Sequence, residues 1–582
     1  MSEHFQRLQR LLPERTAPGS NALTRGTKAL RDWLDHLPYA NPNLAAIRLM
    51  GALNELNASK LEPQQRLDAL ELLRRPIQDI VDGLNKQMQS DAFPMTAAKL
   101  QAGETAHDFE RELAMGYLAV VCDQCAPNGK LPFLRGKIVA LALTRAIQHQ
   151  GARLWNAYQL HCTPIVGVWQ CLHDMFLFAV DVRCDEKADA DALTGGAKIS
   201  PRSAYMQALL HAFAKPYHFT QKENAELRAA LPAMASLCDI RPGYAPEGAI
   251  AVCTDGDRSP PGPPRGRQAP IESLWQLDMS VLRSSLETGL AARREDQRSV
   301  QVASRAGARA ELSGMLAERL VKIWGGRGER ASLRSTEHVV LDTVLGLQGV
   351  HFVLSNNVDF DTFQRRAHET DQDGPVDGRA QIWASAEQSS ERARHARAQT
   401  LDRGIGGYRL RWDRSEEVRA RVGELIALAS TESETHEWAV GVLRWLRVDA
   451  LGAVEAGVEI LSRHARAVSV RSLDANGLPR APMRGMLVVP TQADAAGQVQ
   501  PYIIVPHLFD REAIAVELTR FDESSLHGRA RVETISDMHI RDRGGLYLQI
   551  VLPLQMIDRE SATSAANDDH SAKFVLFPQR KA

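Results

Sequence analysis

Apolar residues in the first 240 positions recur at helical spacing. One series comprises Leu70, Leu73, Ile77, Ile80 and Leu84. Similar series occupy 29–37, 109–122 and 206–213, and an apolar run at 169–182 indicates a buried helix. Pro76 lies inside the first series, so that series is either two helices or one kinked helix. We therefore predict a mostly α-helical region over residues 1–240.

The pattern breaks at residues 241–325. Proline and glycine are concentrated at 241–246 and 259–266, a composition typical of linkers. A short apolar stretch at 249–253 predicts one strand. Helical spacing returns over 270–325 and stops at Gly325-Gly326. We expect a connecting segment with one short strand and helices.

The pattern then becomes that of β-strands. Over 407–412, Tyr408, Leu410 and Trp412 alternate with Arg409 and Arg411, as in a strand with one buried face. Residues 339–354 also suggest β structure, whereas 357–399 are polar and read as an insertion. Short strands separated by glycine turns predict a barrel or sandwich over 326–475. A further β-rich unit follows at 480–560, with a tail at 561–582.

Composition limits the classes of function. The chain has 582 residues, 44% hydrophobic and 24% charged, with a formal net charge of −1. This charge balance argues against a general nucleic-acid coat and against a polybasic membrane binder, so any anion site must be local. The polar start and the lack of an 18-residue apolar run predict neither a signal peptide nor a membrane span. Seven cysteines in so long a chain suggest no disulfide framework. We expect a soluble, multidomain, cytoplasmic protein.

Two motifs suggest a local anion site. The first is Arg330-Ala-Ser-Leu-Arg334, with Arg327 just before it. Arginine forms bidentate phosphate contacts and stacks on purines. The second is Asp402-Arg403-Gly404-Ile-Gly-Gly407. Its carboxylate can accept from a guanine N1–H/N2–H edge, and its glycines allow a close approach by a base or by another strand.

These motifs give residues 327–472 a resemblance to PilZ domains, small bacterial β-barrels that bind cyclic di-GMP. The family signature is an R-x-x-x-R segment followed by a D/N-x-S-x-x-G turn. Arg330 and Arg334 match the first part. Asp402 and Gly407 match the second, in which Gly404 occupies the serine position. A competing basic segment, Arg392-Ala-Arg394-His-Ala-Arg397, lies nearer the turn. We prefer Arg330 and Arg334 because they precede the first β-like run.

The resemblance implies a six-stranded antiparallel barrel and a signalling function as a cyclic di-GMP receptor. The helical N-terminal region rests on the apolar spacing described above, and we expect no enzymatic activity. Arg330 and Arg334 would bind phosphate and stack on guanine, Asp402 would read a guanine edge, and Gly404 and Gly407 would permit close approach. Arg327 and Arg403 are secondary candidates. Ligand binding would change domain packing or binding to a protein partner in motility, pilus or secretion systems. No cofactor or metal is implied.

Two alternatives stay open. In one, the PilZ-like barrel is an interaction scaffold that no longer binds nucleotide. In the other, Cys122-Asp-Gln-Cys125, with His161, Cys162, Cys171 and His173, holds zinc in a hydrolase. His173-Asp174 likewise resembles half of a phosphohydrolase metal pair. Against an enzyme, the sequence contains no G-x-x-x-x-G-K-S/T, H-E-x-x-H or G-x-S-x-G motif, and no GGDEF-like or EAL-like motif.

Overall fold

The structure is a computed structural model that forms two compact units. One comprises Met1–Asp91 and Met95–Glu329, and the other comprises Ala92–Pro94 and Arg330–Ala582. The described residues are 2–17, 26–90, 92–243, 250–260, 271–293, 299–305, 307, 309–325, 335–336, 338–371, 393–414, 416, 418–431, 437–491, 499–521, 530–536, 538–543 and 546–552.

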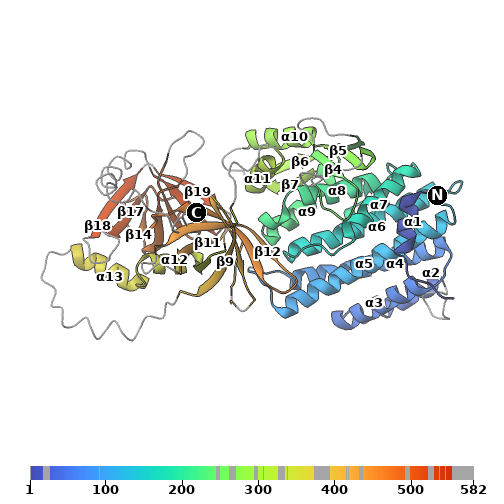
Figure 1. Ribbon diagram of the computed structural model, residues 1–582, viewed down its shortest axis with the longest axis horizontal. Coiled ribbons are helices and arrows are strands. Elements are labelled where there is room, and N and C mark those ends of the chain that lie inside the picture. Colours follow the sequence, from blue (N-terminus) through green and yellow to red (C-terminus); the bar gives the residue numbers. More distant parts are fainter. Residues whose placement is uncertain are drawn as a thin grey trace, which may run out of the picture. The chain divides into compact units, whose positions relative to one another are not determined.

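The first unit is built mainly from α-helices (Figure 1). They are α1 (Glu3–Arg10), α2 (Thr27–Asp35), α3 (Pro42–Ala58), α4 (Pro63–Gln87), α5 (Ala97–Cys125), α6 (Gly136–Gln159), α7 (Val168–Asp181), α8 (Pro201–Phe213) and α9 (Gln221–Ala235). Leu73 of α4, Leu113 of α5 and Leu143 of α6 are at most 2% exposed and share one core. The mostly helical N-terminal region predicted from the sequence is confirmed.

Local chemistry defines several of these helices. Helix α4 continues through Pro76, so the apolar series around it is one helix. The side chain of Asn41 accepts a hydrogen bond from Leu44 N at 3.2 Å and starts α3. Thr220 and Glu223 form a reciprocal capping box at the start of α9. Such caps satisfy backbone N–H groups that the first helical turn leaves without partners.

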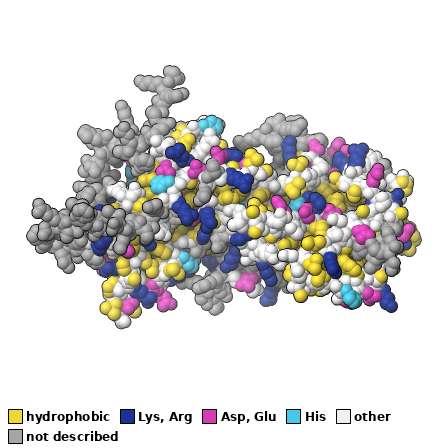
Figure 2. Space-filling model, turned by 90° about the horizontal axis from the view of Figure 1, so that it is seen from below, with side chains coloured by type: hydrophobic (Ala, Val, Ile, Leu, Met, Phe, Trp, Pro, Cys, Tyr) yellow, Lys and Arg dark blue, Asp and Glu magenta, His cyan; other side chains and the backbone are white. Residues whose placement is uncertain are grey.

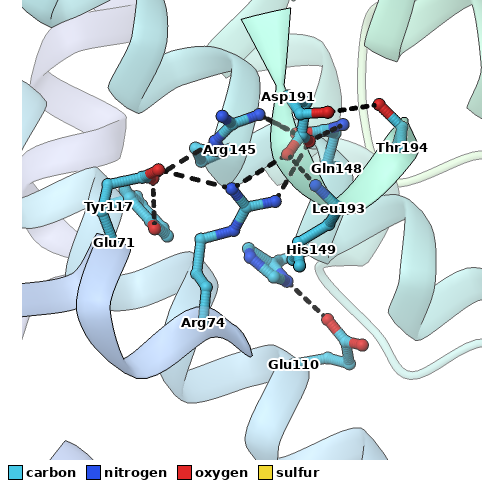
Figure 3. A network of polar contacts seen from close by, with 10 residues as sticks. All are labelled: Glu71, Arg74, Glu110, Tyr117, Arg145, Gln148, His149, Asp191, Leu193 and Thr194. Carbon is cyan, nitrogen blue, oxygen red and sulfur yellow. Dashed lines mark hydrogen bonds and ion pairs between the residues drawn. The ribbon is translucent and has the colours of Figure 1, made fainter. Parts of the chain in front are cut away.

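A buried ionic network fastens a small hairpin to the helices (Figure 3). The hairpin consists of β1 (Asp189–Asp191) and β2 (Ala197–Ile199), joined by the short 3-10 helix η1 (Ala192–Thr194). The buried carboxylate of Asp191 accepts from Arg74 at 3.1 and 3.2 Å and from Gln148 at 3.2 Å. It also pairs with Arg145 at 2.6 Å. The network thus links the hairpin to α4 and α6.

Glu71 and Tyr117 complete the network from α4 and α5. Glu71 accepts from the Tyr117 hydroxyl at 2.7 Å and from Arg145 Nε at 3.2 Å. Two carboxylates, those of Asp191 and Glu71, therefore balance the guanidinium groups of Arg74 and Arg145. Burial acts to raise the pKa of Asp191, but the two arginines outweigh burial and leave that pKa lowered.

The described parts of 241–325 belong to the first unit. They contain β3 (Asp239–Pro242), β4 (Ile250–Cys253), η3 (Ile271–Ser273), β5 (Leu274–Asp278), α10 (Ser280–Ala291), β6 (Ser299–Ala303), β7 (Arg309–Ser313) and α11 (Gly314–Trp324). Strands β3, β5 and β4 form one antiparallel sheet, and β6 pairs with β7. Val252, Trp275 and Leu277 are at most 5% exposed in the helical core. The segment that resembled a linker therefore supplies core residues.

Six strands of the second unit close into an antiparallel barrel in the order β10-β13-β12-β11-β8-β9. They are β8 (Val340–Leu345), β9 (His395–Gly404), β10 (Gly407–Trp412), β11 (Leu425–Ser430), β12 (Ala439–Val448) and β13 (Val454–Ser462). Tyr408, Leu410 and Trp412 are at most 4% exposed. Trp412 Nε1 donates to Thr343 Oγ1 at 3.0 Å. The predicted barrel and the alternation along β10 are confirmed.

Two helices lie between β8 and β9 in the sequence. They are α12 (Gly346–Leu354) and α13 (Phe360–Asp371). The β expectation for 339–354 is therefore wrong beyond Leu345. Gly346 has a φ of +84°, which ends the strand, and Val350 and Val353 then lie on a buried helical face. Within 357–399 the structure describes α13 and the first residues of β9.

A seven-stranded antiparallel sheet forms the rest of the second unit and confirms the predicted C-terminal β structure. Its order is β18-β17-β14-β15-β16-β20-β19. The strands are β14 (Arg466–Leu473), β15 (Met483–Val488), β16 (Tyr502–Pro506), β17 (Ala515–Phe521), β18 (Ala530–Ser536), β19 (His539–Arg543) and β20 (Tyr547–Val551). Val440 and Val442 of the barrel share a core with Met486 and Ile504 of the sheet and Val350 of α12.

Charged side chains of both signs are scattered among hydrophobic ones on the face drawn in Figure 2. This distribution agrees with the formal net charge of −1. Among the residues that the structure describes, no helix combines the length and the apolar character needed to cross a membrane.

Candidate ligand site on the barrel

The β9–β10 hairpin holds four of the seven residues predicted to bind ligand. Asp402, Arg403 and Gly404 end β9, and Gly407 begins β10. Gly404 pairs with Gly407, which leaves Ile405 and Gly406 at the tip, and Ile405 is 82% exposed. Gly406 O accepts from Ile460 N at 2.9 Å, which ties the tip to β13. The hairpin is therefore fixed at one end of the barrel.

The need for glycine at position 407 follows from barrel closure. A Cβ at this position would overlap the carbonyl oxygen of Val458 and would lie 3.0 Å from its carbon and 3.2 Å from Glu459 Cα. All three atoms belong to the backbone of β13, which side-chain rotation cannot move. The sequence suggested that these glycines allow a close approach by a base or by another strand. The structure shows the approach of another strand, β13, to Gly407. A ligand contact at Gly407 and Gly404 stays a prediction.

Ser335 joins the hairpin from a distant part of the sequence. Its N–H donates to Arg403 O at 3.0 Å, and Arg403 N–H donates to Ser335 O at 2.9 Å. Ser335 directly follows Arg334 in the chain. Arg327, Arg330 and Arg334 themselves lie outside the described residues. The residue that directly follows the predicted arginine motif is therefore hydrogen-bonded to the predicted turn.

The competing basic segment runs toward the opposite end of β9. Arg397 is five residues before Asp402 in the same strand, which corresponds to about 16 Å at the usual rise per residue. Arg397 pairs with Asp342 of β8, and Arg394 is an exposed residue just before the strand. Arg392 lies outside the described residues. This arrangement favours Arg330 and Arg334 as partners of the turn.

The strand register creates a row of side chains that the sequence did not reveal. Asp402 of β9 pairs with Arg409 of β10, Arg409 pairs with Gly457 of β13, and Gly457 pairs with Trp445 of β12. Directly paired residues project from the same side of a sheet. Since Arg409 alternates with inward-facing neighbours, the row lies on the outer face of the barrel.

The indole of Trp445 lies over Gly457. A Cβ on that glycine would overlap three ring atoms, so the glycine leaves the space that the ring occupies. A register shift between Leu443 and Trp445 leaves Arg444 without an opposing residue on β13 and turns Trp445 outward. The indole is half-buried and presents a flat apolar surface in the same row as Asp402. Such a surface can stack on an aromatic base.

Arginines and carboxylates surround this row. Arg409 donates to Glu455 at 2.9 Å and lies 3.9 Å from Asp402. Arg447 donates to the same Glu455 oxygen at 2.8 Å, and Arg411 lies 3.7 Å from the other oxygen. Burial acts to raise the pKa of Glu455, but Arg409 and Arg447 outweigh burial and leave that pKa lowered. A single carboxylate thus holds three guanidinium groups over adjacent strands.

Several of the residues predicted to hold zinc are buried in the helical core or hydrogen-bonded to other side chains. Cys122, Cys125 and Cys171 are at most 4% exposed in the helical core. Burial raises the pKa of the Cys125 thiol to about 12, which disfavours the thiolate that zinc requires. His173 Nδ1 lies 2.7 Å from the Tyr205 hydroxyl, and Asp174 accepts from Arg7 Nε at 2.9 Å. Over the described ranges, no three or more His, Cys, Asp or Glu residues group as metal ligands.

Comparison with known proteins found similarity in both halves of the chain. Residues 28–246 match the family model "Cyclic-di-GMP receptor FimW, N-terminal domain". Residues 250–401 and 378–467 match "Cyclic-di-GMP receptor FimW, middle PilZ domain". The chain is 23% identical over 552 residues to the cyclic-di-GMP receptor FimW of Pseudomonas aeruginosa PAO1, with 87% of each chain covered. No solved structure matched the chain.

Proposed function

We propose that this chain, which belongs to the PilZ family, is a cyclic di-GMP receptor that binds the dinucleotide on the outer face of its barrel beside the β9–β10 hairpin. The pairing of Ser335 with Arg403 carries the proposal. One peptide bond separates Arg334 from Ser335, so chain connectivity keeps that arginine within reach of Asp402. Similarity to a protein named as a cyclic-di-GMP receptor supports the same ligand.

Each ligand group has a chemically matched partner in this site. Arg330 and Arg334 bind the phosphates and stack on guanine, with Arg327 and Arg403 as secondary contacts. Asp402 accepts from the N1–H/N2–H edge of a guanine. Gly404 carries no side chain, so a base can approach the backbone there. These roles require a phosphodiester and a purine in one ligand, as in a cyclic dinucleotide.

The outer row of the barrel extends the site. Trp445 supplies a stacking surface in the same row as Asp402, and Arg409 lies between them beside Gly457. Glu455 holds Arg409 and Arg447 in place and neutralises part of their charge. A guanine read by Asp402 can therefore lie along the row, with its face toward the indole and a phosphate toward Arg409.

The protein acts as a receptor rather than as an enzyme. Ligand phosphates bind Arg330 and Arg334 and clamp them against the hairpin, and this change alters domain packing or the binding of a protein partner. A cytoplasmic location fits the seven cysteines, each a free thiol.

Isothermal titration calorimetry of the full chain with cyclic di-GMP tests the proposal. Wild-type protein should bind one ligand or one intercalated pair per chain. Arg334→Ala and Asp402→Ala should each lose about tenfold or more in affinity, as expected for charged hydrogen bonds worth about 1.5–3 kcal/mol. Trp445→Ala should lose a similar amount, since base stacking contributes about 1–3 kcal/mol.

Arg397→Ala is the matched control, because Arg397 lies on the same strand as Asp402 but is exposed near its far end. It should bind ligand like the wild type. A loss in Arg397→Ala with none in Arg334→Ala would move the phosphate site to the competing basic segment. No heat at ligand concentrations of tens of micromolar would refute the receptor proposal and favour an interaction scaffold that no longer binds nucleotide.

A further inference from the structure

The connection between α5 and α6 presents two large apolar side chains to solvent. Phe133 is 89% exposed and Leu134 is 84% exposed. Leu134 has a φ of +61°, a left-handed conformation that leucine rarely adopts. Arg135 N–H donates to Pro132 O at 3.2 Å and closes the turn that displays the pair. Exposed apolar pairs in strained turns are uncommon enough to suggest a function.

The base of this connection is anchored in the core of the first unit. Gly129 N–H donates to Cys125 O at 2.9 Å. A Cβ on Gly129 would overlap the ring of Phe5, so the backbone packs directly on α1. Leu131 also packs against the core. The tip formed by Phe133 and Leu134 therefore projects from a rigid base.

Basic side chains surround the tip. Lys130 and Arg135 flank it in sequence, Lys137 follows in the first turn of α6, and Lys187 lies over Gly136. All four are exposed. Of these, Lys137 lies 3.8 Å from Asp189. Within the described ranges, no carboxylate lies at ion-pair distance from the other three. Glu186, next to Lys187, lies instead 3.6 Å from Arg202.

We propose that this tip is a peripheral membrane contact that inserts Phe133 and Leu134 into the surface of an anionic lipid bilayer. The protruding shape fits a bilayer interface, which yields to an inserted side chain. The surrounding cations fit anionic headgroups, which attract basic residues close to a membrane surface. An acidic protein surface shares the charge but would need a groove for two protruding side chains. This inference is independent of cyclic di-GMP binding.

The test is flotation of the full chain with vesicles. The first set of vesicles contains phosphatidylcholine with about 30% phosphatidylglycerol, and the second contains phosphatidylcholine alone. Both sets are used in about 0.1 M NaCl. Wild-type protein should float with the anionic vesicles only and should be released as NaCl is raised to about 0.5 M. Phe133→Ser/Leu134→Ser should partition at least about 100-fold more weakly. Lys130→Gln/Lys187→Gln should bind roughly 25-fold more weakly.

Ile165 and Val166 provide the matched control. They are a second exposed apolar pair, 53% and 89% exposed, in the connection between α6 and α7. Their neighbour is acidic, since Asp257 accepts from Gly167 N at 2.5 Å and from Trp169 N at 2.9 Å. Ile165→Ser/Val166→Ser should therefore float like the wild type. Unchanged circular dichroism of each variant shows that folding is intact.

Three results would overturn the proposal. The first is wild-type protein that stays with neither vesicle, which would leave an acidic protein surface as the partner of the tip. The second is normal flotation of Phe133→Ser/Leu134→Ser. The third is an equal loss in Ile165→Ser/Val166→Ser, which would indicate general hydrophobic adhesion.

Discussion

Replacing Asp191 with asparagine should strongly destabilise the first unit. The buried carboxylate accepts two hydrogen bonds from Arg74 and one from Gln148, and it pairs with Arg145 at 2.6 Å. Asparagine has nearly the same shape but no charge, and its NH₂ group would face guanidinium donors. The change leaves two buried cations with one carboxylate, that of Glu71. Breaking a buried ion pair in this way costs about 3–5 kcal/mol.

Urea unfolding followed by circular dichroism at about 222 nm measures this effect, because the helices of the first unit dominate that signal. Asp79→Asn is the control. Asp79 lies 3.1 Å from Arg75, but both side chains are more than half exposed. An exposed pair of this kind contributes about 0–0.5 kcal/mol. Asp191→Asn should therefore lower the free energy of unfolding far more than Asp79→Asn. A difference between them below about 1 kcal/mol at pH 7 would refute the reasoning.

The pH dependence of the same pair has a defined sign. The pKa of Asp191 is lowered in the folded protein, so the folded state binds fewer protons than the unfolded state in the acidic range. The stabilisation is fully present above the unfolded value of about 3.9 and is lost as pH falls through the lower folded pKa. The advantage of wild type over Asp191→Asn should be constant from pH 5 to 8 and should shrink below about pH 4.

Three further outcomes are expected. Gly407→Ala should destabilise the barrel by about 1–3 kcal/mol in urea unfolding, because its methyl group would overlap the Val458 backbone; no loss would show that β10 and β13 can separate locally. Gly457→Val should weaken cyclic di-GMP binding about as much as Trp445→Ala by displacing the indole; full affinity would place the base elsewhere. Burial lowers the pKa of His351 to about 4, so the free energy of unfolding should fall as pH drops from about 6.5 toward 4. In His351→Gln, the urea midpoint should depend less on pH between pH 7 and 4.5. An unchanged pH dependence in this variant would contradict the account.

Local patterns in the sequence predicted strand β10 well. Tyr408, Leu410 and Trp412 alternate with Arg409 and Arg411, and this alternation alone separates the barrel interior from its outer face. Pro76 was ambiguous because a proline removes one helical hydrogen bond, and packing of the helix decides whether that loss is tolerated. Residues 346–354 were wrongly predicted as β structure because a short apolar run fits a strand or a buried helix equally well.

The outer row could not be predicted from local patterns. Asp402, Arg409, Gly457 and Trp445 meet because β13 lies between β10 and β12 and because β12 contains a register shift beside Arg444. Strand order and register are set by closure of the whole barrel. A signal was nevertheless present. Trp445 follows Arg444 in one predicted strand and Gly457 lies in the next, and a large aromatic residue near a glycine of a neighbouring strand is compatible with a ring that lies across that strand.

The core shared by the barrel and the C-terminal sheet determines where the second unit can be divided. The family match ends at residue 467, the second residue of β14, so a protein cut there would keep all six barrel strands. It would also expose Val440 and Val442, which Met486 and Ile504 cover. Loss of that apolar cover favours aggregation over solubility. A fragment that ends with the barrel should therefore aggregate, so a truncation of the second unit has to keep the barrel and the sheet together.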